Sequence, residues 1–67
     1  MNLRINGETV HIPEEVTTVE DLLGHFSLAG KVVIVERNGE VLEKADHPRT
    51  RLSDGDRIEI VHFVGGG

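Results

Sequence analysis

Apolar and polar side chains alternate along residues 1–5 and again along residues 9–12. This period of two is typical of β-strands that bury one face. Asn6-Gly7 joins the two segments, and Asn and Gly best tolerate the positive φ angles of a type I′ turn. The sequence therefore predicts a β-hairpin whose second strand ends at Pro13.

A helical period replaces the alternation between residues 17 and 26. Apolar residues recur at positions i, i+3, i+4 and i+7, as Val19, Leu22, Leu23 and Phe26, and such residues form one stripe on a helix. Thr17 followed by Glu20 matches a capping box, which predicts that the helix begins at this point. Because the segment is short and contains Gly24, we expect the helix to be stable only when its stripe packs against a sheet.

The next segment is an unbroken apolar run. Three of the four residues 32–35 are valine and the fourth is isoleucine, which predicts a strand with both faces largely covered. Asn38-Gly39 is a second hairpin signal and leads into a short strand at residues 40–42. Residues 43–51 are mostly polar and are interrupted by proline, so we expect an irregular connection there.

The last predicted strand begins after the turn sequence Ser53-Asp54-Gly55-Asp56 and runs from Ile58 to Val64. One helix then has to cover one face of a mixed sheet of four to five strands, with the first and last strands side by side in the centre. This arrangement is an α+β fold of the β-grasp (ubiquitin-like) type. We expect residues 1–64 to form this domain and residues 65–67 to form a flexible glycine tail.

Composition narrows the class of function. A chain of 67 residues forms one domain that buries only ~60% of its unfolded surface, which favours a binding module or carrier over an enzyme. The absence of cysteine excludes disulfides, thiolate nucleophiles and cysteine metal ligands. The net charge of −5 and the lack of Trp and Tyr argue against nucleic-acid binding. With no signal peptide or membrane span in the pattern, we expect a cytoplasmic protein.

Side chains offer little reactive chemistry. The four histidines, which lack metal-ligand spacing, are His11, His25, His47 and His62. We expect them to be solvent-facing or partly packed, with no metal bound. The acidic residues near the helix start are explained by capping and solubility, and Asp54 and Asp56 by turn formation. No serine triad and no phosphate-binding loop is present.

The tail Gly65-Gly66-Gly67 therefore remains as the candidate site. Three extended residues span ~10 Å, and glycine fits a tunnel too narrow for any side chain. The carboxylate of Gly67 would then reach a partner enzyme's active site, to be activated as an acyl-adenylate. Without cysteine, carried sulfur would have to be a thiocarboxylate at this carboxyl group. A frayed chain end or a cloning remnant is the alternative explanation of the glycines.

The strand before the tail provides a candidate docking surface. Ile58 and Ile60 alternate with polar residues and should face the helix. Val61 and Phe63 should then point to the uncovered face, beside Val64 and the tail. We predict an exposed apolar patch that docks a protein partner. Packing of Val61 and Phe63 on a neighbouring loop is the alternative.

Taken together, the motifs resemble those of the ThiS family of sulfur carriers along the whole chain. The segments that carry the resemblance are residues 3–7, 19–23, 33–39, 54–60 and 62–67. The resemblance implies that a ThiF-like adenylyltransferase uses ATP and Mg²⁺ to adenylate Gly67, and that a cysteine desulfurase supplies the sulfur. It also implies that the tail, through Gly65 and Gly66, enters thiazole synthase and donates the sulfur. The chain itself would be a carrier, not an enzyme, with no bound cofactor and a monomeric free state.

Three alternative interpretations stay open at this point, two of them related carriers or modifiers and the third a binding module of a different class. The small subunit of molybdopterin synthase shares the terminal glycines, but its last strand typically contains proline where this chain has Phe63-Val64. A ubiquitin-like modifier would form an isopeptide bond with lysine instead of donating sulfur. A TGS-type regulatory module shares the Asp54-Gly55-Asp56 turn but needs no terminal glycines.

Overall fold

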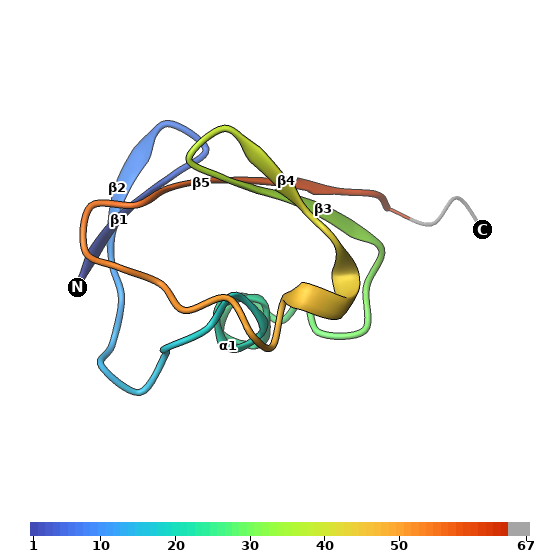
Figure 1. Ribbon diagram of the computed structural model, residues 1–67, viewed down its shortest axis with the longest axis horizontal. Helices are drawn as coiled ribbons and strands as arrows, with labels where there is room; N and C mark the ends of the chain where they lie inside the picture. The colour runs from blue at the N-terminus through green and yellow to red at the C-terminus, as the bar shows by residue number, and fades with distance from the viewer. Residues whose placement is uncertain (65–67) are drawn as a thin grey trace.

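The computed structural model describes residues 1–64 of the 67-residue chain. The described residues contain five strands, one α-helix and one short 3₁₀ helix (Figure 1). In chain order these are β1 (Asn2–Ile5), β2 (Glu8–His11), α1 (Val19–His25), β3 (Val33–Arg37), β4 (Glu40–Leu42), η1 (Lys44–Asp46) and β5 (Arg57–His62).

The strands form a single mixed sheet in the order β2-β1-β5-β3-β4. β1 and β5 are parallel and lie next to each other in the sheet, while the other neighbours are antiparallel. Figure 1 shows α1 and the segment from η1 to β5 on one side of this sheet, and no element on the other side among the residues described. The predicted β-grasp roll, with adjacent first and last strands, is confirmed.

The core lies between the sheet and α1. The largest side chains that are fully buried come from both layers: Leu3, Ile12, Leu22, Ile58, Val19 and Val35. Burial of one such Leu or Ile side chain contributes ~1.5–3 kcal/mol. Leu52, after the irregular connection, completes the core from the same side as the helix.

Both predicted hairpin turns have the expected backbone. Asn6 and Gly7 have φ angles of 48° and 84°, and Asn38 and Gly39 have φ angles of 51° and 86°. These positive values identify both turns as type I′-like, in agreement with the Asn-Gly signals.

The helix cap differs from the prediction by one residue. Thr18, not Thr17, is the N-cap, and Asp21, not Glu20, completes the capping box. The Asp21 N–H donates to Thr18 Oγ1 at 3.1 Å, and the Thr18 N–H donates to Asp21 Oδ2 at 3.2 Å. Hydrogen bonds from the Thr17 backbone and hydroxyl, and from Thr18, lower the pKa of Asp21. Thr18 is extended because it forms a β-bridge with Arg51, so the helix begins after it.

Two expectations about apolar burial are wrong. The run at residues 32–35 is covered on one face only, since Val35 is buried while Val32 and Ile34 are 70% and 45% exposed. One helix covers one face of a sheet, so alternate side chains of β3 remain open to solvent. Phe26 is the C-cap of α1 and is 37% exposed, so it does not extend the buried stripe.

The last strand is shorter than predicted. β5 ends at His62 instead of Val64. Its neighbour β3 begins at Val33, and the Phe63 N–H still donates to the Val32 carbonyl at 3.1 Å. Ladder pairing therefore stops where β3 begins, and Phe63 and Val64 lead from the sheet toward the tail.

Candidate functional site

The predicted tail residues Gly65, Gly66 and Gly67 lie outside the described residues. The structure does give the segment from which they continue. β5 lies between β1 and β3 in the sheet. Its C-terminal end lies on the side of the molecule opposite to the turn that precedes the strand (Figure 1). The candidate site is thus attached to a central strand of the sheet.

β5 is held differently on its two sides. Along β3 it is paired from Arg37 opposite Ile58 to Val33 opposite His62. Along β1 the paired residues are only Arg57 and Ile58, because β1 ends at Ile5. Past that point, the side chain of Asn6 forms two hydrogen bonds with the backbone of Ile60.

The turn before β5 is fixed by the buried carboxylate of Asp56. Its oxygens accept hydrogen bonds from Arg37 Nε at 2.9 Å, from Asn38 Nδ2 at 3.1 Å and from the Ser53 N–H at 2.8 Å. Burial raises the pKa of Asp56, but the hydrogen bonds and the positive charge of Arg37 lower that pKa by more, so it lies below its ordinary value. Asp54 also supports the turn by accepting the Asn2 N–H at 2.7 Å.

The predicted alternation along β5 is confirmed. Ile58 is fully buried and Ile60 packs against the core. Val61, by contrast, lies on the open face of the sheet and is 51% exposed, and Phe63 is equally exposed. Val64 is exposed as well. Within residues 1–64, therefore, no loop covers Val61 and Phe63.

Two neighbours of these residues were missed by the sequence argument. Ile34 on β3 lies directly opposite Val61, and Val41 on β4 lies opposite Glu36, so both share the open face. Both are also large exposed apolar residues. We call Ile34, Val41, Val61 and Phe63 the open-face patch. The sequence did hold a signal for Val41. The two-residue turn at Asn38-Gly39 fixes the register of β3 and β4, and this register pairs Val41 with Glu36.

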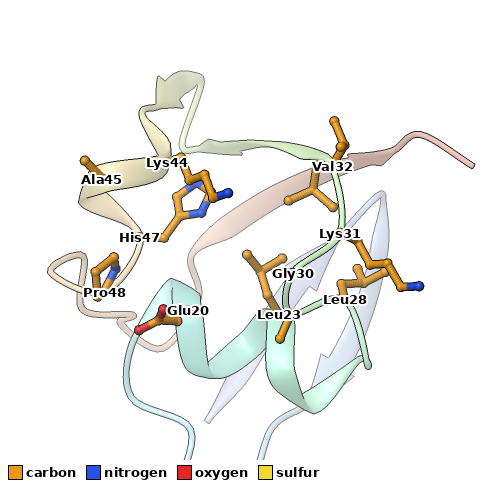
Figure 2. A pocket seen from close by; sticks show the side chains of 12 residues that line it. Glu20, Leu23, Leu28, Gly30, Lys31, Val32, Lys44, Ala45, His47 and Pro48 are labelled. Carbon is orange, nitrogen blue, oxygen red and sulfur yellow. The ribbon is translucent and has the colours of Figure 1, made fainter. Parts of the chain in front are cut away.

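A hollow of about 690 Å³ lies on the helix side of the sheet. Leu23, Leu28 and Val33 provide apolar walls, and the two lysines of the sequence, Lys31 and Lys44, also line it (Figure 2). His47 borders the hollow and is buried, with no hydrogen-bond partner for Nε2 among the described residues. The expectation of solvent-facing or partly packed histidines is wrong for His47, which caps the end of η1 and is only 6% exposed.

The remaining titratable side chains of the described residues are not gathered into a reactive cluster. His11 Nδ1 lies 2.9 Å from Asn2 Oδ1 on the surface, and His25 packs edge-on against Phe26. Among residues 1–64 there is no group of three or more His, Asp or Glu side chains placed to hold a metal ion. No helix in this part of the chain is long and apolar enough to cross a membrane.

Comparison with known proteins gives one consistent family. The ThiS family model matches residues 3–67. The sulfur carrier protein ThiS of Bacillus subtilis is 48% identical over 65 residues, which cover 97% of this chain and 98% of that protein. The crystal structure of the thiamine biosynthesis protein ThiS from Geobacter metallireducens is similar with a TM-score of 0.82 and 39% identity, and the match covers all of both chains.

A second kind of relative is much longer. A thiazole synthase of Paramagnetospirillum magneticum is 43% identical over the whole of this chain, which spans 20% of that protein. Because the family model covers nearly the whole chain, and the Bacillus protein is 48% identical along almost all of it, the chain belongs to the ThiS family of sulfur carrier proteins.

Proposed function

We propose that this chain carries sulfur for thiamine biosynthesis as a thiocarboxylate on Gly67, and that thiazole synthase receives the sulfur. The observation that carries the proposal is the 48% identity to a sulfur carrier along almost the full length. The family-model match at residues 3–67 also includes the three terminal glycines. The fold supports it, since the tail continues from a central strand, while the described side chains provide no reactive cluster.

The chemistry requires activation first, because a carboxylate is a poor electrophile. In the proposed sequence, an oxygen of the Gly67 carboxylate attacks the α-phosphorus of ATP and pyrophosphate leaves. A persulfide sulfur then attacks the carbonyl carbon of the acyl-adenylate and AMP leaves. A thiol finally cleaves the resulting S–S bond, which releases the thiocarboxylate and forms a disulfide. Partner enzymes would supply the ATP site and its Mg²⁺.

Three partners follow from this chemistry. A ThiF-like adenylyltransferase would activate Gly67, and a cysteine desulfurase would provide the persulfide. Thiazole synthase would accept the sulfur with Gly65 and Gly66 threaded into its active site, where the absence of a Cβ permits a narrow passage. Similarity of the whole chain to one fifth of two thiazole synthases, from Paramagnetospirillum magneticum and Magnetococcus marinus, supports the last pairing.

The open-face patch is the proposed docking surface for these enzymes. Its apolar side chains lie on the face that no described element covers, and Phe63 is followed directly by Val64 and the tail. Burial of such a patch stabilises a complex and brings the tail to the partner. We also propose a monomer in the free state, since the patch has to stay available, and a cytoplasmic location where ATP is supplied.

Genetic complementation tests this proposal against the related carriers. The chain is expressed in a bacterial strain that lacks its own ThiS carrier and is grown without thiamine or thiazole. We expect the chain to restore growth and the variant without Gly67 to fail. Failure of the intact chain, combined with rescue of a strain that lacks the small subunit of molybdopterin synthase, would contradict the proposal and favour the molybdopterin pathway.

A further inference from the structure

The side chain of Asn6 reaches back from the first turn to β5. Its Nδ2 donates to the Ile60 carbonyl at 3.1 Å, and its Oδ1 accepts the Ile60 N–H at 2.8 Å. The Asn6 backbone N–H also donates to the Ile58 carbonyl at 2.9 Å. Asn6 thus makes three hydrogen bonds to the strand that leads into the tail, although it lies 54 residues before Ile60.

These contacts replace a missing piece of strand. β1 pairs with β5 as far as Ile5 opposite Ile58, and the chain then turns away at Asn6-Gly7. On that side of β5, the N–H and the carbonyl of Ile60 would have no backbone partner. A primary amide has both a donor and an acceptor, so one asparagine side chain satisfies both groups and extends the ladder after the strand has ended.

The second hairpin makes an equivalent contact at the other end of β5. Asn38 occupies the same turn position, with a φ of 51°. Its Oδ1 accepts the Arg57 N–H at 2.9 Å, and its own N–H donates to the Arg57 carbonyl at 2.8 Å. Asn38 therefore holds the first residue of β5, whereas Asn6 holds the part that is close to the tail.

We infer that Asn6 is a positioning residue, which fixes Ile60 and thereby the end of β5, the described segment from which the tail continues. The inference rests on the proposed function of the tail. Without the amide, β5 from Ile60 onward would be held along β3 alone, and residues 60–64 would fluctuate more. A longer mobile segment lowers the effective concentration of its end at a partner's active site, and each additional ordered residue adds an entropic cost.

Substitution by glycine separates this role from that of the turn. Asn6→Gly keeps a residue that adopts positive φ without strain, so the hairpin is retained and only the amide is lost. Asn38→Gly is the control, with the same substitution at the same turn position, but its amide contacts are with Asp56 and Arg57 at the far end of β5. Asn6→Asp keeps the acceptor for the Ile60 N–H and loses the donor, which provides a milder second variant.

The experiment uses the full chain with the adenylyltransferase and ATP, at a temperature where circular dichroism shows all variants folded. Pyrophosphate release at varied carrier concentration gives kcat, a binding titration gives Kd, and NMR hydrogen exchange follows the Ile60 amide. For Asn6→Gly we expect about tenfold lower kcat, Kd within about threefold of the parent chain and faster Ile60 exchange. The kcat of Asn6→Asp should lie between those of Asn6→Gly and the parent chain. Asn38→Gly should keep a kcat near that of the parent chain.

Two outcomes would overturn the inference. A kcat for Asn6→Gly equal to that of the parent chain, or an equal loss in Asn6→Gly and Asn38→Gly, would show that the amide does not position the tail. Absence of any adenylation of the parent chain would contradict the proposed function itself, and the inference with it. The two failures are distinguished by the activity of the parent chain.

Discussion

Ile34 and Val61 lie directly opposite each other on β3 and β5, on the face of the sheet that α1 does not cover. They are 45% and 51% exposed, although both are in the middle of the sheet. Side chains on opposite residues of an antiparallel pair are ≈ 4.5–5.5 Å apart at Cβ, so the two form one continuous apolar surface. Adjacent Phe63 extends this surface toward the tail.

The open-face patch should contribute to binding and little to folding. We expect Ile34→Ala and Phe63→Ala each to weaken the affinity for a partner enzyme by about 1–2 kcal/mol, which is roughly tenfold in Kd. Their unfolding free energies should change by less than about 1 kcal/mol, since both residues are about half exposed. Calorimetric titration with the adenylyltransferase and with thiazole synthase, and urea unfolding, measure the two quantities.

Thr9→Ala is the matched control for these two variants. Thr9 is exposed on β2 and pairs with Arg4, which places it on the same open face at the other end of the sheet. We expect its affinity for either partner to stay within about twofold of the parent chain. Unchanged affinity of Ile34→Ala and Phe63→Ala for both partners would refute the docking role of the patch.

The Asp56 carboxylate should make stability depend on pH in acid. Its pKa is lower in the folded than in the unfolded chain, so its stabilising effect is fully present above about pH 5 and is lost as the pH falls below about 4. We expect Asp56→Asn to lower the unfolding free energy by about 1–3 kcal/mol at pH 7, since Arg37 loses its charged partner. In urea unfolding, the difference between variant and parent should narrow from pH 5 toward pH 2; a difference that stays constant would contradict this assignment.

The observed capping box makes a separate prediction for α1. We expect Thr18→Ala to lower the unfolding free energy by about 1 kcal/mol, because the Asp21 N–H loses its side-chain acceptor. Glu20→Ala should have an effect within about 0.5 kcal/mol, since Glu20 has no capping bond. Thermal or urea unfolding of both variants distinguishes the two assignments, and a larger loss for Glu20→Ala would favour the cap predicted from the sequence.

The tail should determine transfer and not folding. We expect the addition of one residue after Gly67, or the deletion of Gly67, to abolish sulfur transfer in a reconstituted reaction. The unfolding free energy should remain within about 0.5 kcal/mol of the parent value, because the core packing of β5 ends at Ile60. Sulfur transfer at the parent rate by the chain with one added residue would contradict the role of Gly67.

The parts of the fold that local chemistry determines were predictable from the sequence. The two Asn-Gly turns fixed both hairpins, and alternation along β5 placed Ile58 inside and Val61 outside. Where the prediction was wrong, contacts between distant parts of the chain determined the local structure or burial. The bridge between Thr18 and Arg51 moved the helix cap by one residue, and a β-branched run at residues 32–35 could not reveal that only one face would have a helix to cover it.

The site was predictable only in part, for the same reason. The exposure of Val61 and Phe63 followed from alternation in one strand, whereas Ile34 and Val41 join the patch through pairing between strands. The contacts of Asn6 with Ile60 link the two ends of the chain, and no local pattern indicates such a pairing. The functional roles of Gly65, Gly66 and Gly67 stay predictions, which rest on the sequence and on family membership.

Intact mass spectrometry of the chain shows directly whether Gly67 is converted to a thiocarboxylate. The chain is incubated with a ThiF-like adenylyltransferase, ATP, Mg²⁺, a cysteine desulfurase, cysteine and a thiol reductant, and fragmentation locates any change. We predict a gain equal to the mass of one sulfur atom minus one oxygen atom, located at Gly67 and dependent on ATP. An unchanged mass, or an adenylate that never exchanges AMP for sulfur, would contradict it.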